Sequence, residues 1–355
     1  MSYKTMKIKK YYDFLRSNNS FSKTGFNQQL KILFNILEYL RSNINKQLII
    51  KNKPVIAQIE PTSHCNLQCE MCIRKKIGVP IGTMSFKDFK RILEKLDSLS
   101  KIHLSGQGEP LLNKDLFNMI KYANKRGIIV FFTTNGTLLT KNIINKICEV
   151  DIGEIGISID STNKKKYEKI RKGAKFENVK KNVKNLVLEL KKRKKKTIVS
   201  TSAVILKENI KEIPEFVELA NSLGIKKVGF QTIQEKEDYI DKYDSKIKTQ
   251  TISNFNRKIK EKIKEAKGIA KKYDMTVIFD EEKSPGCIWP WRSIYITWNG
   301  NITPCCKILD YRKPFFGNIL KENFWKIWNG EEYQLFRKLL RKRKAPLACK
   351  GCNMV

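Results

Sequence analysis

The sequence predicts an α/β protein in which a parallel sheet is covered by helices, followed by a small α+β domain. From about residue 54 to 235, short apolar runs alternate with amphipathic stretches, the pattern of repeated strand–helix units. With 355 residues, 41% of them hydrophobic, the chain can form one large and one smaller packed domain. The series fits a partial (β/α)6 barrel, although the pattern alone also allows a doubly wound sheet.

The apolar runs give the expected strands of the large domain, which we place at 51–235. They are 55–59, 101–105, 128–134, 154–160, 197–205 and 227–232. The stretches between them have helical patterns, for instance 85–99, 115–126 and 209–223. Ser85 followed by Asp88 indicates a helix start, because a side-chain oxygen can cap the first free amides.

Residues 1–50 form a basic lead-in with one amphipathic segment. Apolar residues recur there at helical spacing and predict a single apolar stripe. They are Phe26, Leu30, Leu33, Phe34, Leu37 and Leu40. We expect this stripe to pack against the large domain, with a membrane-surface helix as the alternative.

The composition changes after residue 280. Residues 236–280 predict a charged linker with a helix at 252–272 and a strand at 275–279. Beyond them, all five Trp lie between 289 and 328, and this shift marks a second domain at 281–355. Asn299-Gly300 between two apolar runs predicts a hairpin, because both residue types tolerate positive φ. An amphipathic helix is expected at 322–341.

The net charge of +36 does not by itself define a function. Lysines are spread along the whole chain, and the basic runs lie at expected helix ends, where cations are favoured. We therefore do not expect specific nucleic-acid binding, although a basic surface would attract an acidic electron donor. No apolar stretch reaches the length of a membrane span, and the N-terminus lacks a secretory signal. We expect a cytoplasmic protein with reduced thiols.

Three cysteines follow the first expected strand in the spacing C-x3-C-x2-C. They are Cys65, Cys69 and Cys72, with no fourth ligand nearby. Iron–sulfur clusters are held by Cys thiolates, and a cubane with three protein ligands keeps one iron open. A structural zinc site is the alternative for this loop.

This loop resembles the signature loop of the radical S-adenosylmethionine (SAM) enzymes. The resemblance implies a [4Fe-4S] cluster whose open iron chelates the amino and carboxylate groups of SAM. It also implies closure of the strands into a partial barrel. An electron from the reduced cluster would cleave SAM to methionine and a 5′-deoxyadenosyl radical, which abstracts hydrogen from a substrate. A flavodoxin or ferredoxin is the kind of electron donor expected.

The run Ser105-Gly-Gln-Gly-Glu-Pro110 resembles the family's GGE motif, with Gln107 where many members have Gly. The resemblance implies that Gly108 and Glu109 bind the SAM amine. Polar residues at two later strand ends, Asn135, Ser158 and Asp160, match positions around the SAM ribose and methionine. For Asp160, capping of the next helix is the alternative.

The C-terminal cysteines resemble the SPASM or twitch extension of radical SAM enzymes. The implied ligands of one auxiliary [4Fe-4S] cluster are Cys287, Cys305, Cys349 and Cys352. Cys306 is the alternative to Cys305 as a ligand. Adjacent strand residues point to opposite faces, so both should not face one cluster, and the Gly-x4-Cys spacing favours Cys305. A zinc site with four cysteine ligands is again the alternative. Cys148 is expected to be a core thiol.

The resemblance implies an enzyme that acts on a C–H bond. A peptide or protein side chain, modified by a maturase, is the preferred substrate. A small molecule such as a sugar alcohol or lipid, dehydrogenated or rearranged, is the rival. A zinc protein that binds nucleic acid through its basic surface is a remote alternative.

Overall fold

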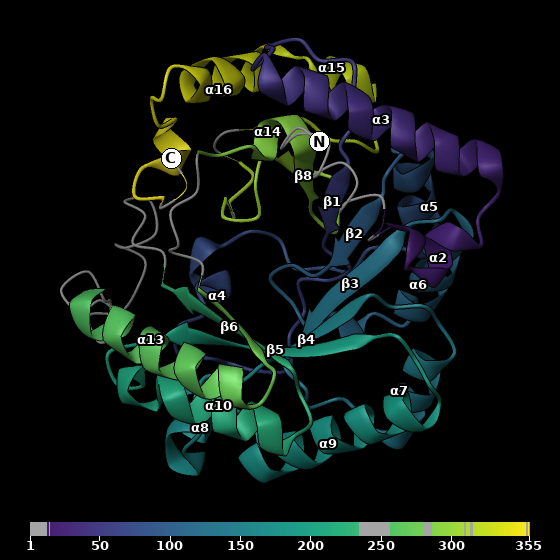
Figure 1. The fold of residues 1–355 in the computed structure, drawn as a ribbon. Coiled ribbons are helices and arrows are strands. Elements are labelled where there is room, and N and C mark those ends of the chain that lie inside the picture. The colour runs from purple at the N-terminus through teal and green to yellow at the C-terminus, as the bar shows by residue number, and fades with distance from the viewer. Residues whose placement is uncertain are drawn as a thin grey trace.

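A computed structural model describes residues 13, 15–233, 256–279, 286–308, 310–312, 315–352 and 354. Its centre is a nine-stranded sheet in the order β7-β6-β5-β4-β3-β2-β1-β8-β9. All neighbouring strands are parallel except β8 and β9. The strands curve into an arc with helices around its outside (Figure 1). The predicted α/β fold class with a parallel sheet is therefore confirmed.

The predicted strands form where the apolar runs indicated them. Their bounds are β1 Ile56–Ile59, β2 Lys101–Leu104, β3 Ile129–Thr134, β4 Glu154–Ser158, β5 Ile198–Ile205, β6 Lys227–Thr232 and β7 Thr276–Phe279. The second predicted strand ends one residue early and the fourth two residues early. Ser105 and Asp160 therefore lie in the loops that follow, whereas Ser158 is the last residue of β4, at the carboxyl edge of the sheet.

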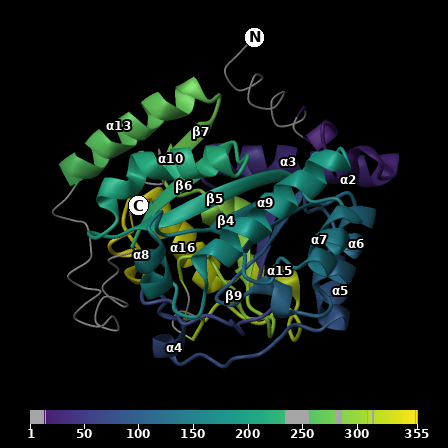
Figure 2. The ribbon, with the colours of Figure 1, turned by 90° about the horizontal axis from the view of Figure 1, so that it is seen from below.

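The helices form a layer outside the strands. Their bounds are α4 Arg74–Ile77, α5 Phe86–Lys95, α6 Leu116–Lys125, α7 Lys141–Cys148, α8 Lys164–Ile170, α9 Phe176–Lys192, α10 Ile213–Ser222 and α13 Asn256–Lys272. Ser85 caps α5 as predicted, because its hydroxyl accepts a hydrogen bond from Asp88 N–H. Viewed from below, α13 lies beside α10 (Figure 2). Predicted residues 252–255 lie outside the described part of the chain.

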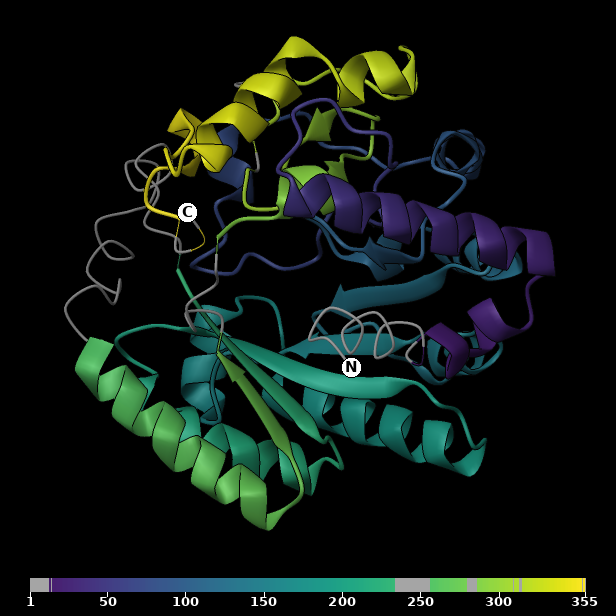
Figure 3. The same ribbon diagram turned by 45° about the horizontal axis from the view of Figure 1, so that its top comes forward.

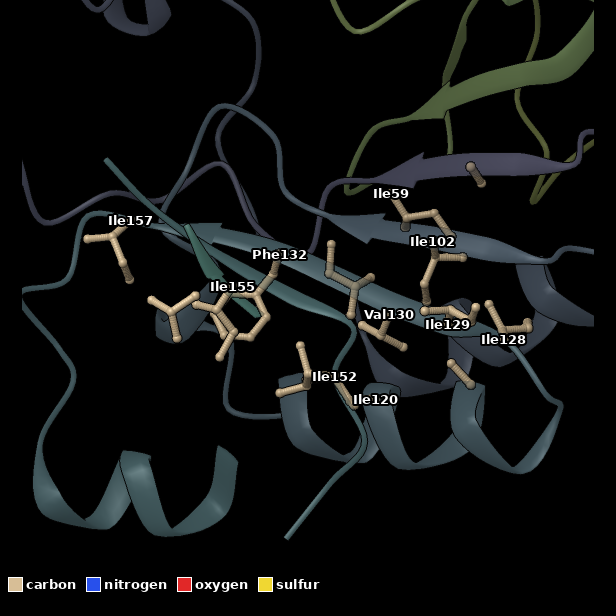
Figure 4. Packing of buried hydrophobic residues seen from close by; sticks show 14 of the residues in the cluster. Ile59, Ile102, Ile120, Ile128, Ile129, Val130, Phe132, Ile152, Ile155 and Ile157 are labelled. Carbon is tan, nitrogen blue, oxygen red and sulfur yellow. The ribbon is translucent and has the colours of Figure 1, made fainter. Parts of the chain in front are cut away.

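The two faces of the curved sheet differ in polarity. Alternate residues of each strand point toward the helices and are apolar and buried, for instance Ile102, Val130 and Ile155. Figure 4 shows them on the side of the strands where Ile120 of α6 lies. The other residues point to the inside of the arc and are only half-buried. The hydrophobic core therefore lies between strands and helices, whereas the inner face carries most of the polar strand residues together with a few apolar ones such as Ile56 and Phe131.

The predicted N-terminal helix forms, but only part of its predicted stripe packs against the large domain. α3, Phe26–Ile44, buries Ile32, Asn35, Ile36 and Tyr39. Of the predicted stripe, Leu33 and Leu40 pack against the core, whereas Phe26 is 70%, Phe34 64% and Leu37 49% exposed. Hydrogen bonds determine the orientation of the helix. The Asn35 side chain exchanges hydrogen bonds with the backbone of Lys53, and this turns the face of α3 that carries Asn35 inward. A short helix, α2 at Asn19–Ser22, precedes α3.

The C-terminal segment continues the main sheet. β8, Ser293–Ile296, follows α14, Trp289–Arg292, and pairs in parallel with β1. β9, Ile302–Thr303, completes the predicted hairpin, in which only Gly300 adopts positive φ. The predicted helix 322–341 is two helices, α15 Phe324–Trp328 and α16 Glu331–Arg341, before the short turn η4 Leu347–Cys349. Figure 3 shows the yellow α15 and α16 on the opposite side of the strands from the green α13. No described helix is long and apolar enough to cross a bilayer.

Candidate active site

The cysteine triplet lies in the loop between β1 and α4, at the carboxyl edge of the sheet. Cys65 and Cys69 are partly buried, and Cys72 is exposed. Leu67 N–H points at the Cys65 sulfur at 3.5 Å, a contact that favours a thiolate. The loop is fixed by backbone bonds from Gln68 and Glu70 to the end of α8 and the residues after it. The exposed end of the triplet leaves room for a group that binds from solvent.

The charges around this loop suit an iron–sulfur cluster. Burial raises the pKa of the Cys69 thiol to about 11, whereas the nearby Arg171 guanidinium opposes this. The Tyr167 hydroxyl is buried, has no hydrogen-bond partner among the described residues, and interacts electrostatically with Cys69. A cationic guanidinium and an unused donor beside a thiol both stabilise negative charge. The three cysteines and their surroundings therefore fit a cluster held by thiolates.

The Gly-Gln-Gly-Glu-Pro turn packs directly on the cysteine loop. A Cβ at Gly108 would lie 2.3 Å from Thr62 O and 2.4 Å from His64 O. Glu109 N–H donates to His64 O at 2.8 Å. The resemblance implied that Gly108 and Glu109 bind the SAM amine. In the structure, Gly108 lets this turn approach the backbone of the cysteine loop, so that the two segments form one surface.

Glu109 joins this surface to the end of β3. Its carboxylate accepts hydrogen bonds from Thr134 Oγ1 at 2.7 Å and from Asn135 N–H at 2.8 Å. Burial raises its pKa, which these hydrogen bonds oppose. The Asn135 amide in turn donates to Asn66 of the cysteine loop at 2.9 Å. A carboxylate has about four lone-pair sites, so Glu109 keeps the capacity to accept from an ammonium group.

Ser158 and Asp160 have different positions at the end of β4. Ser158 is half-buried on the inner face, opposite Ser202 of β5. Asp160 is fully buried, and its carboxylate accepts from Arg171 Nε at 2.6 Å and from Val204 N–H at 2.7 Å. It does not cap the following helix, because Asn163 does so. Asp160 holds Arg171 next to Cys69, and no described contact aims its carboxylate at the inner face.

Arg171→Met is expected to lower the free energy of unfolding by about 3–5 kcal/mol, because the buried Asp160 carboxylate loses its partner. Burial alone would lower the pKa of Arg171, but Asp160 outweighs it and the pKa is raised. Urea denaturation measures the loss. Arg257→Met is the control, because Arg257 is 95% exposed in its pair with Glu261 and should change stability by less than about 1 kcal/mol. Equal effects of the two substitutions on stability would contradict the assignment of Arg171 as the buried partner of Asp160.

Glu60 is a site residue that the sequence did not single out. It directly follows β1 and is buried, and burial raises its pKa. Its carboxylate accepts from Gln107 N–H at 2.7 Å and from Trp298 N–H at 3.2 Å. The Tyr295 hydroxyl of β8 donates to it at 3.3 Å. Glu60 therefore joins the glycine turn to the C-terminal hairpin, and its place after a strand was the signal that could have found it.

Three of the C-terminal cysteines lie near one another, and the other two have different surroundings. Cys287, Cys305 and Cys352 lie close enough to interact electrostatically, and burial raises the pKa of Cys287 to about 11. Cys349 is buried one turn before Cys352, whose N–H donates to its carbonyl. Cys306 interacts instead with Tyr295, toward the barrel. No three His, Cys, Asp or Glu side chains in the described ranges converge closely enough to hold one metal ion. Lys307 N–H points at the Cys305 sulfur at 3.3 Å, which fits a thiolate ligand.

Comparison with known families identifies these two cysteine regions. Residues 59–220 match the radical SAM superfamily, and residues 287–353 match the iron–sulfur cluster-binding domain named SPASM. The chain belongs to the radical SAM superfamily. It is an enzyme, and its cofactors are a [4Fe-4S] cluster, SAM and auxiliary iron–sulfur. The zinc alternatives and the nucleic-acid-binding alternative are therefore not supported.

Two relatives match this radical SAM enzyme over most of both chains. The tungsten-containing aldehyde ferredoxin oxidoreductase cofactor-modifying protein of Pyrococcus furiosus is 27% identical over 322 residues, 83% of this chain and 86% of its own. The AdoMet-dependent heme synthase of Methanosarcina barkeri is 26% identical over 329 residues, 86% of this chain and 90% of its own. The similarity therefore extends across both the barrel and the C-terminal domain.

A solved structure has the same fold. SuiB of Streptococcus suis, bound to its precursor peptide SuiA, superposes with a TM-score of 0.66 at 18% identity. The match covers 85% of this chain and 70% of SuiB. The predicted barrel followed by a SPASM domain is confirmed by this likeness and by the family matches.

Proposed function

We propose that this radical SAM enzyme abstracts hydrogen from a peptide or protein side chain that enters the inside of the strand arc. The observation that carries the proposal is the position of Ser158. It lies on the half-buried inner face, at the edge where the cysteine loop and the glycine turn meet. When bound, the cluster and SAM supply a 5′-deoxyadenosyl radical. The chain's own residues hold these groups and exclude water.

We assign the residue roles from this geometry. Cys65, Cys69 and Cys72 hold the SAM cluster, and Arg171, fixed by Asp160, stabilises its negative charge. Gly108 and Glu109 receive the amine of SAM, and Ser158 contacts its ribose or methionine. Asn135 anchors Asn66 of the cysteine loop, so its role is to position that loop.

Four cysteines are proposed to hold one auxiliary cluster. They are Cys287, Cys305, Cys349 and Cys352. A flavodoxin or ferredoxin is the proposed reductant, and the chain's net charge of +36 suits an acidic protein of this kind.

A Cys305→Ala variant is expected to lose about four of about eight iron atoms per chain, because one cluster loses a ligand. Cys306→Ala is the matched control and should retain all of them, since Cys306 faces Tyr295 rather than Cys287. Iron and sulfide analysis after anaerobic purification measures both. Loss of iron from Cys306→Ala with retention in Cys305→Ala would reverse the assignment.

The substrate class is tested with fully deuterated cell extract separated into macromolecules and small molecules. The enzyme, SAM and dithionite are added to each fraction, and deuterium in 5′-deoxyadenosine is measured by mass spectrometry. The proposal expects deuterium from the peptide and protein fraction. Label only from the small-molecule fraction would reject it, and no 5′-deoxyadenosine at all would reject SAM cleavage itself.

SuiB and its bound precursor peptide support the peptide class. A small-molecule substrate is the second candidate, and it is favoured by the names of the two relatives that match over most of their length. One modifies an enzyme cofactor and the other makes heme.

A further inference from the structure

The inside of the strand arc is hollow because small residues occupy inward positions. Closed parallel barrels are commonly filled by layers of bulky branched side chains. Here the inner face of β4 has Gly156, that of β6 has Gly229, and that of β5 has Ser200 and Ser202. These positions line a cavity of about 410 Å³. This volume is ample for a substrate group of moderate size.

We call this cavity the chamber. Charged residues line it at the amino-terminal end of the strands, and we call this end the chamber floor. They are Lys101 of β2, Glu154 of β4 and Lys227 of β6. Lys227 Nζ donates to both Glu154 oxygens, at 2.8 and 2.7 Å, and Ser200 Oγ donates to one of them at 2.6 Å. Arg292, just before β8, adds a further cation that interacts with Lys101. Among the described residues that line the cavity, one carboxylate therefore stands beside two cations, and Arg292 lies near Lys101 outside the lining.

Above the floor, the described residues that line the cavity are uncharged and include polar residues such as Thr133 and apolar ones such as Ile278. Burial lowers the pKa of His103 to about 4, so this imidazole is neutral near pH 7. Its Nε2 lies 3.2 Å from Thr133 Oγ1. From Glu154 the inner face of β4 rises through Gly156 to Ser158, four residues or about 13 Å along the strand. The excess positive charge is thus confined to the end of the chamber that lies farthest from the proposed SAM contacts.

We propose that the chamber floor binds an anionic group of the substrate, a carboxylate or phosphate, through Lys101 and Lys227, with Arg292 adding positive charge near Lys101. This inference rests on the proposed function, since it assumes that the substrate occupies the chamber. The anion offsets the excess positive charge in a partly desolvated site, where attraction between opposite charges is stronger than in water. It also orients the substrate, with its acidic end at the floor and its reacting C–H bond toward Ser158. An acidic peptide side chain and an acidic small molecule share this chemistry.

The test uses anaerobically purified, cluster-loaded enzyme with SAM and measures affinity by calorimetry. The small-molecule probe is trimesate (benzene-1,3,5-tricarboxylate), compared with its neutral triamide. The peptide probe is N-acetyl-Gly-Glu-Gly-amide, compared with the same peptide containing Gln. We expect at least one acid to bind about tenfold or more tightly than its neutral partner, and the identity of that acid distinguishes the two sources. Acids that bind no better than amides would overturn the inference.

Variants of the floor separate recognition from a structural role. Lys101→Gln should weaken binding of the acid about tenfold, and Lys101→Arg should retain it. Glu154→Gln should strengthen binding, because it removes the negative charge that competes with the anion. Lys264→Gln, at an exposed position of α13, is the control and should change nothing. Weakened binding in both Lys101→Gln and Glu154→Gln would indicate only a structural ion pair and would overturn the inference.

The pH dependence has a defined sign. Burial, together with Arg292, lowers the pKa of Lys101 to about 8, and Glu154 opposes this. Lysine is charged below its pKa, so affinity for the acid should fall as pH rises through about 8, with His103 neutral throughout. Lys101→Arg should remove this decline, and a decline of the same size in Lys101→Arg would count against Lys101. SAM cleavage without substrate is measured in parallel, so a failed inference is distinguishable from a failed enzyme assignment.

Discussion

A Cys65→Ala variant is expected to release no detectable 5′-deoxyadenosine and to retain about four of about eight iron atoms per chain. Removal of one of three thiolates leaves too few ligands in a loop whose other donors are Cys69 and Cys72. Liquid chromatography after dithionite reduction with SAM measures cleavage, and iron analysis measures the clusters. The auxiliary cluster should persist, because its proposed ligands lie in the C-terminal domain.

Cys148→Ala is the matched control for this experiment. Cys148 is buried in α7 among core residues. Its substitution by Ala should lower the free energy of unfolding by about 1 kcal/mol or less and should cause no loss of iron. Full SAM cleavage by Cys65→Ala would mean that the cluster is held elsewhere. Loss of iron from Cys148→Ala would show that the iron count does not report on ligands alone.

Gly108→Ala is expected to weaken SAM binding by about tenfold or more. The added Cβ would lie 2.3 Å from Thr62 O and 2.4 Å from His64 O, and both of these are backbone atoms that cannot rotate away. The glycine turn must therefore move off the cysteine loop, which displaces Glu109. Overpacking of this kind also costs about 1–3 kcal/mol of stability. Equilibrium dialysis with labelled SAM gives the affinity, and urea denaturation gives the stability.

Gly268→Ala serves as the control, and its expected change in stability is opposite in sign to that of Gly108→Ala. Gly268 lies inside α13, and a Cβ there meets nothing within 4 Å. Alanine in a helix interior is about 0.5–1 kcal/mol more favourable than glycine, so this variant should gain stability and bind SAM normally. Normal SAM affinity in Gly108→Ala would show that the turn and the cysteine loop tolerate separation.

The parallel strands were predictable because each is a short apolar run, and burial of a strand requires that composition. The face of α3 was not predictable from spacing. Its apolar positions form two overlapping stripes, and a buried Asn35 that bonds to the backbone of Lys53 decides between them. Likewise, Asn299-Gly300 predicted the hairpin, but only Gly300 uses positive φ, where Leu320 also leaves no room for a Cβ.

For the site, residue types and spacing could be read from the sequence, but contacts between distant segments could not. The Cys65 loop and the Gly108 turn were found because each is a local pattern. Arg171 was not, because its pairing with Asp160 beneath Cys69 depends on how α8 folds back across the strand end. Glu60 was missed for a similar reason, since two of its partners, Tyr295 and Trp298, lie over 200 residues away in sequence.

The pairing of β8 with β1 has a consequence for how the protein can be divided. The two family matches are separate in sequence, yet Ser293–Ile296 completes the hydrogen bonding of Ile56–Ile59 within one continuous sheet. A truncation before residue 287 would turn β1 into an open edge strand, which invites intermolecular pairing. The barrel and the auxiliary domain are therefore expected to unfold in a single cooperative transition. Chimeras that exchange the auxiliary domain between relatives would need a matched β1 edge.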